Sequence, residues 1–242
     1  MKVLFSPSEA KTTVASDDET YIQNNQFGSN RQALDIYKSY LLSSSKDALG
    51  KLFGLKKEND IEFFKSIDIF NSPTIKAILR YSGVAYQHLE YRSLEQNEQE
   101  FIDKNIIIFS NLFGPIMANE LIPNYKLKQG EKLGNLIIEK YYKEHSSLQL
   151  DEFLKDEFII DLRAGFYLKF YALKKPHITL KFLKEGKVVS HWAKAYRGKI
   201  LRELSYYQPQ NEKEFQEISF KNLQIKEILK RKNINEYIFN IN

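Results

Sequence analysis

Short apolar runs that are typical of buried strands occur from one end of the chain to the other. Residues 3–5 stand at the start, residues 106–109 are rich in β-branched side chains, and residues 158–162 follow further along. Helical patterns, such as the one over residues 31–49, separate these runs. Strands that are interspersed with helices along the whole length indicate one folding unit. We therefore predict a single α+β (mixed α/β) domain over residues 1–242, with a central mixed sheet surrounded by helices.

The same patterns predict the remaining elements. Helices are expected over residues 31–49, 58–65, 74–81, 85–89, 95–101, 134–145, 196–204 and 223–232. Alternation over residues 177–183 and 187–192 predicts a hairpin, and residues 237–239 are expected to form a terminal strand. Gly50 is expected to end the first helix, Gly114-Pro115 to form a turn, and the polar residues 12–30 to form a loop.

Composition excludes several classes of protein. The chain has no cysteine, which rules out a disulfide scaffold, a thiolate zinc site and a cysteine nucleophile, and fits a reducing cytoplasm. No stretch approaches the ~18 apolar residues of a membrane span, and the apolar run before Pro7 is too short for a signal peptide. We therefore expect a cytoplasmic protein without a membrane partner.

Positive charge is concentrated in one part of the chain. Residues 161–202 hold eleven basic side chains against two acidic ones, a net +9, whereas the whole chain is only +5. Phenylalanine, tyrosine and tryptophan are interleaved with these basic residues. Localised positive charge of this kind is the electrostatic footprint of a polyanion-binding face.

Polar side chains follow two of the predicted buried strands. Ser8, Glu9 and Lys11 come after the first strand, and Asp161 and Arg163 end a later one. Strand ends that deliver hydroxyl, carboxylate and basic groups into loops are a common way to build a polar site. The alternative interpretations are an ordinary surface loop for the first group and a local ion pair for the second.

A third basic cluster opens a predicted helix. Lys194 and Arg197 are three residues apart and share a helical face, and the start of a helix also offers free N–H groups to a phosphate. The alternative is a solvated basic face. Lys169, Lys199 and Arg202 lie in the same basic segment and complete the candidate contacts to nucleic acid there.

Residues 52–55, Leu-Phe-Gly-Leu, lie between two predicted helices and have the pattern of a helix-hairpin-helix. In that element the backbone N–H groups contact the DNA backbone without sequence preference, and Lys56 is the flanking cation that we include as a candidate contact. A helix that ends at a glycine explains the same pattern. The four histidines show no metal-type spacing, and no glycine-rich nucleotide motif is present, so we expect no metal and no cofactor.

Five segments occur in an order that resembles the YaaA family of peroxide-stress proteins over nearly the whole chain. They are SPSEAK at 6–11, YSGVAYQHL at 81–89, FSNLFGPIMANELIPNYKL at 109–127, IIDLRAGFYLKF at 159–170 and HWAKAYRGKILREL at 191–204. The resemblance implies a mixed α/β domain with a helix-hairpin-helix and a positively charged cleft. It also implies binding to duplex and distorted DNA in the setting of peroxide damage and recombination repair, with lowered free iron.

By position, the residues on the family's motifs are Ser8, Glu9, Lys11, Gly83, Tyr86, Ser110, Gly114, Tyr125, Asp161, Arg163, Lys169, Lys194, Arg197 and Gly198. Given the resemblance, we expect the separated strand-end motifs to converge on one cleft. The residues expected to line it are Ser8, Glu9, Lys11, Asp161, Arg163, Lys194 and Arg197.

Two functions fit these residues. The first is DNA binding without sequence preference, in the response to peroxide, through Lys11, Arg163, Lys169, Lys194, Arg197, Lys199, Arg202 and Lys56. The alternative is an enzyme that acts on a nucleobase or nucleotide in the same cleft, using Glu9 and Asp161 with Lys11 and Arg163, and with Ser8 as a further catalytic candidate. Oxygen ligands alone favour no selective iron site, so we expect any effect on iron to be indirect.

Overall fold

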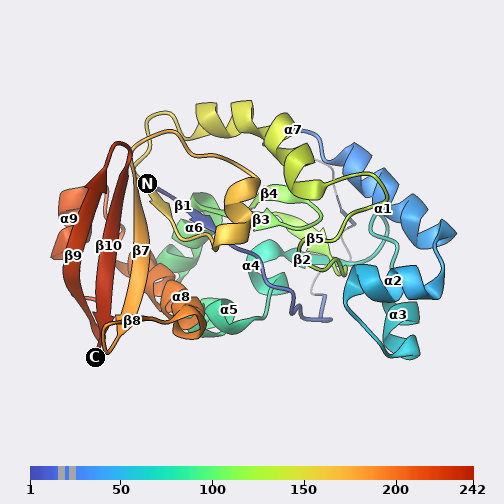
Figure 1. The fold of residues 1–242 in the computed structure, drawn as a ribbon, viewed down its shortest axis with the longest axis horizontal. Helices are drawn as coiled ribbons and strands as arrows, with labels where there is room; N and C mark the ends of the chain where they lie inside the picture. The colour runs from blue at the N-terminus through green and yellow to red at the C-terminus, as the bar shows by residue number, and fades with distance from the viewer. Residues whose placement is uncertain (16–19, 22–25) are drawn as a thin grey trace.

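A mixed sheet forms the centre of the fold, and its strands come from both ends of the chain (Figure 1). The computed structural model describes residues 1–15, 20–21 and 26–242. Over these residues the order of strands in the sheet is β4-β3-β1-β6-β7-β10-β9, with β8 paired to β7. The strands are β1 Lys2–Phe5, β3 Ile106–Ser110, β4 Gly114–Met117, β6 Ile159–Asp161, β7 His177–Lys184, β8 Lys187–Val188, β9 Leu223–Arg231 and β10 Ile234–Ile241.

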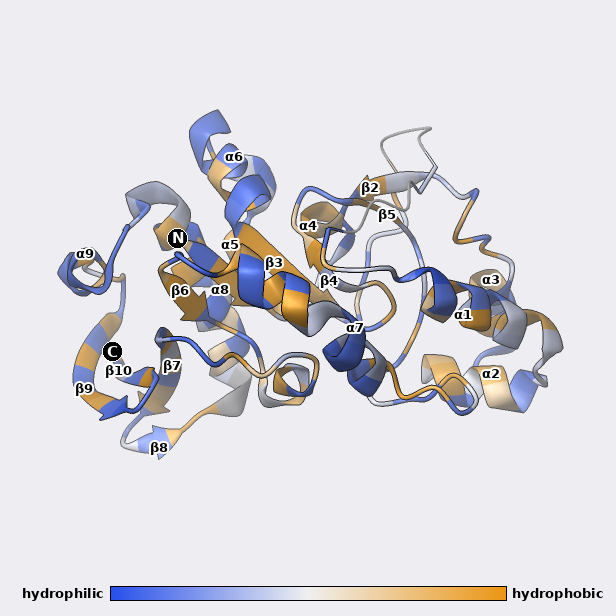
Figure 2. Ribbon diagram, turned by 90° about the horizontal axis from the view of Figure 1, so that it is seen from above, coloured by the Kyte–Doolittle hydropathy of each residue, from blue (hydrophilic) through white to orange (hydrophobic). Residues whose placement is uncertain are grey.

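The predicted buried strands form the middle of this sheet. β1 is parallel to β3 on one side and to β6 on the other, so that Val3 lies between Ile106 and Ile160. These side chains are fully enclosed, which is the environment that continuous β-branched runs require. β3 appears orange along its length in the hydropathy view (Figure 2). Because β1 and β6 are parallel neighbours, their carboxyl ends deliver the loops that follow them to the same edge of the sheet.

Helices and a small second sheet surround the central sheet. The helices are α1 Arg31–Ser43, α2 Lys46–Phe53, α3 Glu58–Lys65, α4 Ala77–Arg80, α5 Val84–Leu89, α6 Gln96–Asn105, α7 Ile138–Phe153, α8 Ser190–Tyr207 and α9 Glu212–Glu217, with 3-10 turns η1 Tyr91–Ser93 and η2 Gly165–Lys169. β2 Thr74–Lys76 and β5 Leu121–Pro123 form the second sheet. One cluster of buried apolar side chains extends from Val3 to Phe239, so the described elements share a core. Among the described residues, no helix combines the length and the apolarity that a membrane crossing requires.

Several elements differ from the sequence-based predictions. The predicted helix 31–49 is two helices, because Ser45 begins α2 by accepting a hydrogen bond from the backbone N–H of Ala48. Gly50 lies inside α2, and Gly54 ends it with a positive φ of 67°. α7 starts at Ile138, four residues later than expected. Of the predicted second hairpin strand, residues 187–188 form β8, whereas residues 190–192 belong to α8.

One prediction of a helix and one of a turn were wrong, and a second predicted helix was wrong in its first three residues. Residues 223–231 form β9, which pairs antiparallel with β10. Residues 74–76 form β2, where Ile75 pairs with Ile122, and only residues 77–80 of the predicted helix 74–81 are helical. Gly114 and Pro115 begin β4, with the turn in residues 111–113. Part of the predicted loop 12–30, residues 16–19 and 22–25, lies outside the described residues.

Candidate functional site

The loop after β1 is fixed by hydrogen bonds from three parts of the chain. The Ser6 hydroxyl accepts from the backbone N–H of Ala164 at 2.7 Å, which ties the loop to the segment after β6. The Ser6 carbonyl accepts from the Tyr86 hydroxyl at 2.9 Å, which ties it to α5. The backbone N–H of Ser82 donates to the carbonyl of Ala10 at 3.0 Å. The end of β1 therefore presents Ser8 and Glu9 in one defined conformation, next to α5.

α5 and α8 pack closely side by side and supply the opposite wall (Figure 1). Gly198 in α8 faces the backbone of Ala85 so closely that a Cβ atom would overlap the Ala85 carbonyl oxygen. Gly83, which precedes α5, is equally close to the side chain of Ser8. The two glycines bring the first loop, α5 and α8 into direct contact.

Gly198→Ala is expected to destabilise the protein by about 1–2 kcal/mol. Overpacking costs about 1–3 kcal/mol, and the better helix propensity of alanine offsets up to about 1 kcal/mol of it. The free energy of unfolding from urea titration measures the effect. Gly165→Ala is the control, because a Cβ at Gly165 meets nothing within 4 Å. Equal stability of the two variants would contradict the tight contact between α5 and α8.

A cavity of about 380 Å³ opens between these elements. Its lining comes from the end of β1, the loop after it, the start of α5, the segment after β6 and the second turn of α8. The lining residues are Phe5, Ser6, Pro7, Ser8, Glu9, Ala10, Gly83, Val84, Ala85, Tyr86, Gln129, Leu162, Ala164, Tyr167, Lys194 and Arg197. The three separated segments of the prediction, around residues 8, 162 and 194, thus meet at one place.

Two basic side chains of α8 face this cavity without a hydrogen-bond partner among the described residues. Lys194 and Arg197 line it, and neither side chain makes a hydrogen bond or ion pair with any other residue that the structure describes. Burial lowers the pKa of Arg197 from its usual value, and the nearby negative charge of Asp161 opposes that shift. A half-buried guanidinium with its donors unused is suited to an anionic ligand that carries several acceptor oxygens.

Glu9 provides the carboxylate of the cavity. One of its carboxylate oxygens accepts from the backbone N–H of Gln129 at 3.1 Å, and its carbonyl oxygen accepts from the ammonium of Lys126 at 3.4 Å. The side chain is exposed, and within the described chain its second carboxylate oxygen has no partner. Glu9 therefore retains an acceptor for a ligand.

Lys11 lies behind the first loop rather than in the lining of the cavity. Its ammonium donates to the carbonyl of Ser8 at 3.3 Å and stands 4.1 Å from the centre of the Tyr125 ring. Burial is the main cause that lowers the pKa of Lys11 to about 7, and the positive charge of Lys126 adds to it while Glu9 opposes it. At neutral pH a part of this amine is therefore uncharged, and such an amine can accept a proton.

Asp161 and Arg163 do not line the cavity, contrary to our expectation. The two side chains form a buried, two-pronged ion pair, with Nη2 of Arg163 2.7 Å from Oδ2 of Asp161 and Nε 2.9 Å from Oδ1. Nη1 of Arg163 donates to the carbonyls of Tyr167 and Tyr171. The Arg163 side chain is 1% exposed and has no surface to offer a phosphate. The pair holds the segment after β6 in place, which positions Ala164 and Tyr167 in the cavity wall.

The other predicted cations lie elsewhere. Lys199 and Arg202 line a different cavity of about 490 Å³, and Arg202 donates to the carbonyls of Leu89 and Glu90 at the end of α5. Lys169 is exposed on η2 beside the Phe166 ring, and Lys56 is exposed between α2 and α3. The structure thus brings together Ser8, Glu9, Lys194 and Arg197, with Lys11 behind them.

The predicted helix-hairpin-helix is not confirmed. α2 and α3 are present with Gly54 between them, but the backbone N–H groups of Gly54 and Leu55 donate to carbonyls of α2, at Lys51 and Gly50. Gly54 also packs against the side chain of Lys128. Those two N–H groups are therefore engaged in ending the helix, which is the alternative interpretation of the pattern.

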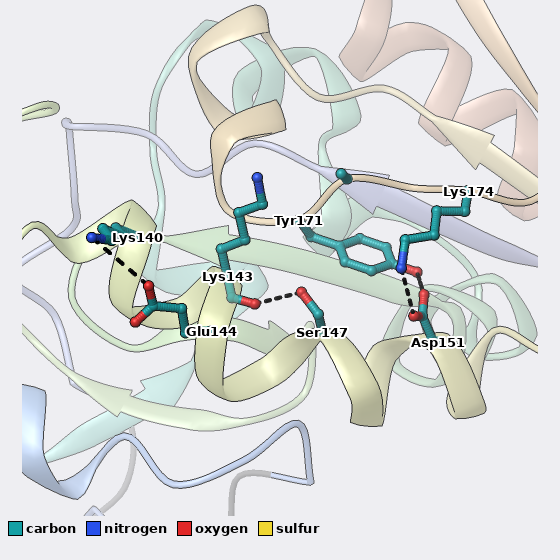
Figure 3. A pocket seen from close by; sticks show the side chains of 8 residues that line it. Lys140, Lys143, Glu144, Ser147, Asp151, Tyr171 and Lys174 are labelled. Atoms are coloured by element: carbon teal, nitrogen blue, oxygen red, sulfur yellow. Dashed lines mark hydrogen bonds and ion pairs between the residues drawn. The ribbon is translucent and has the colours of Figure 1, made fainter.

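A third cavity, of about 350 Å³, lies along α7 and is also lined by lysines (Figure 3). Lys140 lies 4.0 Å from Glu144, and Lys174 lies 3.7 Å from Asp151, whose carboxylate also accepts from the Tyr171 hydroxyl. Most of its positive charge is thus already paired by the protein. In the described residues there is also no group of three or more His, Asp or Glu side chains that could hold a metal ion. The cavity between β1, α5 and α8 is therefore the better candidate site.

Sequence reasoning missed several residues of the cavity. Gln129 reaches Glu9 from a loop after β5 that carries no recognisable motif, and Ala164 and Leu162 contribute through their place after a strand. The apolar Phe5 ends a predicted strand, where burial in the core was the simpler interpretation. Only its position at the carboxyl end of a central strand could have indicated the site.

The fold and this cavity define a mixed α/β protein with a cavity, lined in part by Lys194 and Arg197, at the carboxyl ends of parallel central strands. The chain belongs to the family described as Peroxide stress protein YaaA, whose model matches residues 1–229. An uncharacterized protein of Campylobacter jejuni is 47% identical to it, with 94% of each chain covered. A UPF0246 protein of Corynebacterium glutamicum is 32% identical, with 85% of each chain covered, and one of Fusobacterium nucleatum is 25% identical, with 87% of this chain and 88% of the relative covered.

Proposed function

We propose that this peroxide-stress protein binds DNA without sequence preference, through the cleft between β1, α5 and α8. The observation that carries the proposal is the pair Lys194 and Arg197, which face a cavity and have no partner in the described chain. Backbone phosphates present the charge and the acceptor geometry that an unused guanidinium binds well. Phosphate oxygens carry no sequence information, so such contacts give affinity without base preference.

Replacement of Lys194 and Arg197 together by alanine is expected to weaken duplex binding for every sequence tested. Each lost phosphate contact reduces the slope of log K against log salt by about 0.9, so the slope should fall by about 2 in magnitude. Fluorescence anisotropy with a labelled duplex at several salt concentrations measures both quantities.

The matched control is Lys226→Ala with Lys230→Ala. Both lysines are exposed on the edge strand β9, and the double change removes the same net charge. We expect this variant to keep the wild-type slope to within about half a unit, because a long-range charge effect is screened within about 10 Å at 0.1 M salt. A Lys194/Arg197 variant that behaves like the control would exclude the cleft as the place of phosphate contact.

An enzyme that acts on a nucleobase or nucleotide is a second candidate, and the carboxylate of Glu9 and the amine of Lys11 favour it. Glu9 offers a free carboxylate oxygen there, and Lys11 behind it carries a pKa of about 7, near the pH at which a general base operates best. Asp161 and Arg163 are not part of this machinery, because they are closed in their own ion pair. Incubation of damaged and undamaged oligonucleotides with several divalent metals, followed by product analysis, tests it. A product that Glu9→Gln abolishes supports catalysis, and no product under any condition leaves DNA binding alone.

A further inference from the structure

The size of the cavity limits what part of a DNA molecule can enter it. Its volume of about 380 Å³ is at the lower end of the range, roughly 300–1,000 Å³, that is typical of small-ligand pockets. A paired duplex presents its backbone on the outside and cannot enter such a space. One nucleotide that is unpaired and turned out of the strand is the unit of DNA that fits.

The walls divide into an aromatic part and a charged part. Tyr86 and Tyr167 line the cavity with 7% and 4% of their surface exposed, and Phe5, which is only 1% exposed, packs edge to face against the Tyr86 ring with the ring centres 5.5 Å apart. The Tyr86 hydroxyl is fixed by the Ser6 carbonyl, so this wall is rigid before a ligand arrives. Rigid aromatic walls accept a planar base at little entropic cost.

The charged part lies at the mouth formed by α8 and the first loop. Arg197 and Lys194 offer unused donors to a phosphate, and Glu9 offers one unused acceptor oxygen. A carboxylate accepts and never donates, so it recognises an N–H group at the edge of a base. Aromatic wall, acceptor and cations together match the base, the base edge and the phosphate of a single nucleotide.

We propose that the cavity receives one unpaired nucleotide of a DNA strand, with its base against Tyr86 and Tyr167, its edge at Glu9 and its phosphate at Arg197. The inference rests on the function proposed above and adds the unit of DNA that the same cleft selects. An unpaired nucleotide has little stacking energy to lose when it leaves the helix, so the cleft favours sites where a base is already unpaired.

The test compares two duplexes that differ only in one base. Each contains a single-nucleotide bulge, either an adenine nucleotide or an abasic tetrahydrofuran nucleotide, so that both are equally flexible and carry the same phosphates. The measured quantity is the ratio of the two dissociation constants. We expect the wild-type protein to bind the adenine bulge roughly tenfold more tightly, since base–aromatic stacking contributes about 1–3 kcal/mol per base.

Three variants test whether the preference for the adenine bulge arises in the cavity. Ala164→Phe fills the cavity from a half-buried position in its wall and should bring the ratio to about one, and Glu9→Ala, at an exposed position, should reduce it about three- to fivefold. Arg197→Ala should weaken binding of both duplexes and leave the ratio unchanged, because both contain the phosphate. Should Ala164→Phe not fold, the Glu9→Ala ratio decides.

The outcomes separate the two proposals. A wild-type ratio of about one, with both duplexes bound, overturns the single-nucleotide inference and leaves DNA binding in place. A tenfold ratio that persists in Glu9→Ala and Ala164→Phe also overturns it, because the base is then recognised elsewhere. Failure of the wild-type protein to bind either duplex overturns the proposed function itself.

Discussion

Asp161→Ala is expected to lower the free energy of unfolding by about 3–5 kcal/mol, the usual cost of leaving one member of a buried ion pair without its partner. The Asp161 and Arg163 side chains are only 3% and 1% exposed, and both carboxylate oxygens accept from the guanidinium. Without Asp161, Arg163 keeps its two carbonyl partners and the face of the Phe109 ring, 4.5 Å away, but no counter-charge that bonds to it directly. Urea unfolding at neutral pH measures the loss.

Two variants separate this effect from an ordinary surface ion pair. Asp35→Ala removes the partner of Arg31 in an exposed pair on α1, and it should cost less than about 1 kcal/mol. Asp161→Ala combined with Arg163→Met replaces the buried charges by apolar groups and should recover most of the lost stability. A loss in Asp161→Ala as small as that in Asp35→Ala would mean that the buried guanidinium does not depend on this carboxylate.

The central strands were predictable because their burial on both faces leaves a direct mark on the sequence. Residues 106–109 are Ile-Ile-Ile-Phe, a run too apolar and too β-branched for a surface position, and the structure encloses all of it. Residues 3–5 and 158–162 are apolar runs of the same kind. In the structure, residues 3–5 pair with residues 106–108 on one side, and β1 pairs with β6 on the other. The order of these strands in the sheet had no local signal, since it depends on contacts between segments more than a hundred residues apart.

The edge strand β9 shows why a periodic pattern can mislead. Leu223 and Ile225 alternate as a strand requires, but the next apolar residue on the chain is Ile228, which restores a helical spacing. In the structure the register against β10 shifts between Ile238 and Phe239, so one residue of β9 is inserted as a bulge and the alternation changes phase. A single inserted residue is thus enough to turn a strand pattern into an apparent helix pattern.

The position of the candidate site could be predicted from the sequence, but the set of side chains that line it could not. Loops that follow neighbouring parallel strands lie at the same edge of the sheet, so residues in these loops are expected to lie close together. Ser8 and Glu9, which follow β1, line the same cavity as Leu162 and Ala164, which follow β6. The rule does not say which side chains turn toward solvent, and Asp161 instead turns toward Arg163, two residues on. On α8, Lys199 follows Lys194 by five residues, about 140° around the helix, so the two face different cavities.

Glu120 is expected to make the stability of the protein decrease as the pH rises. Its Oε1 atom is buried without a hydrogen-bond partner in the described part of the chain, and burial raises the pKa of the carboxyl to about 8, with a backbone hydrogen bond at Met117 opposing the shift only in part. The folded state therefore holds this proton more tightly than the unfolded state, where the pKa is 4.5. The associated stability is complete below about pH 4.5, is lost by about 1.4 kcal/mol per pH unit above it, and stops changing above about pH 8.

Glu120→Gln keeps the shape of the side chain and removes the titration. The difference in the free energy of unfolding between this variant and the wild-type protein should be small at pH 4.5 and should grow to about 3–5 kcal/mol in favour of the variant at pH 8. Lys11, whose lowered pKa makes stability rise with pH between about 7 and 10.5, is present in both proteins and cancels in the difference. Glu62→Gln, at an exposed position on α3, is the control for the replacement of a carboxylate by an amide. A flat difference for Glu120→Gln would show that the carboxylate is solvated in the folded protein.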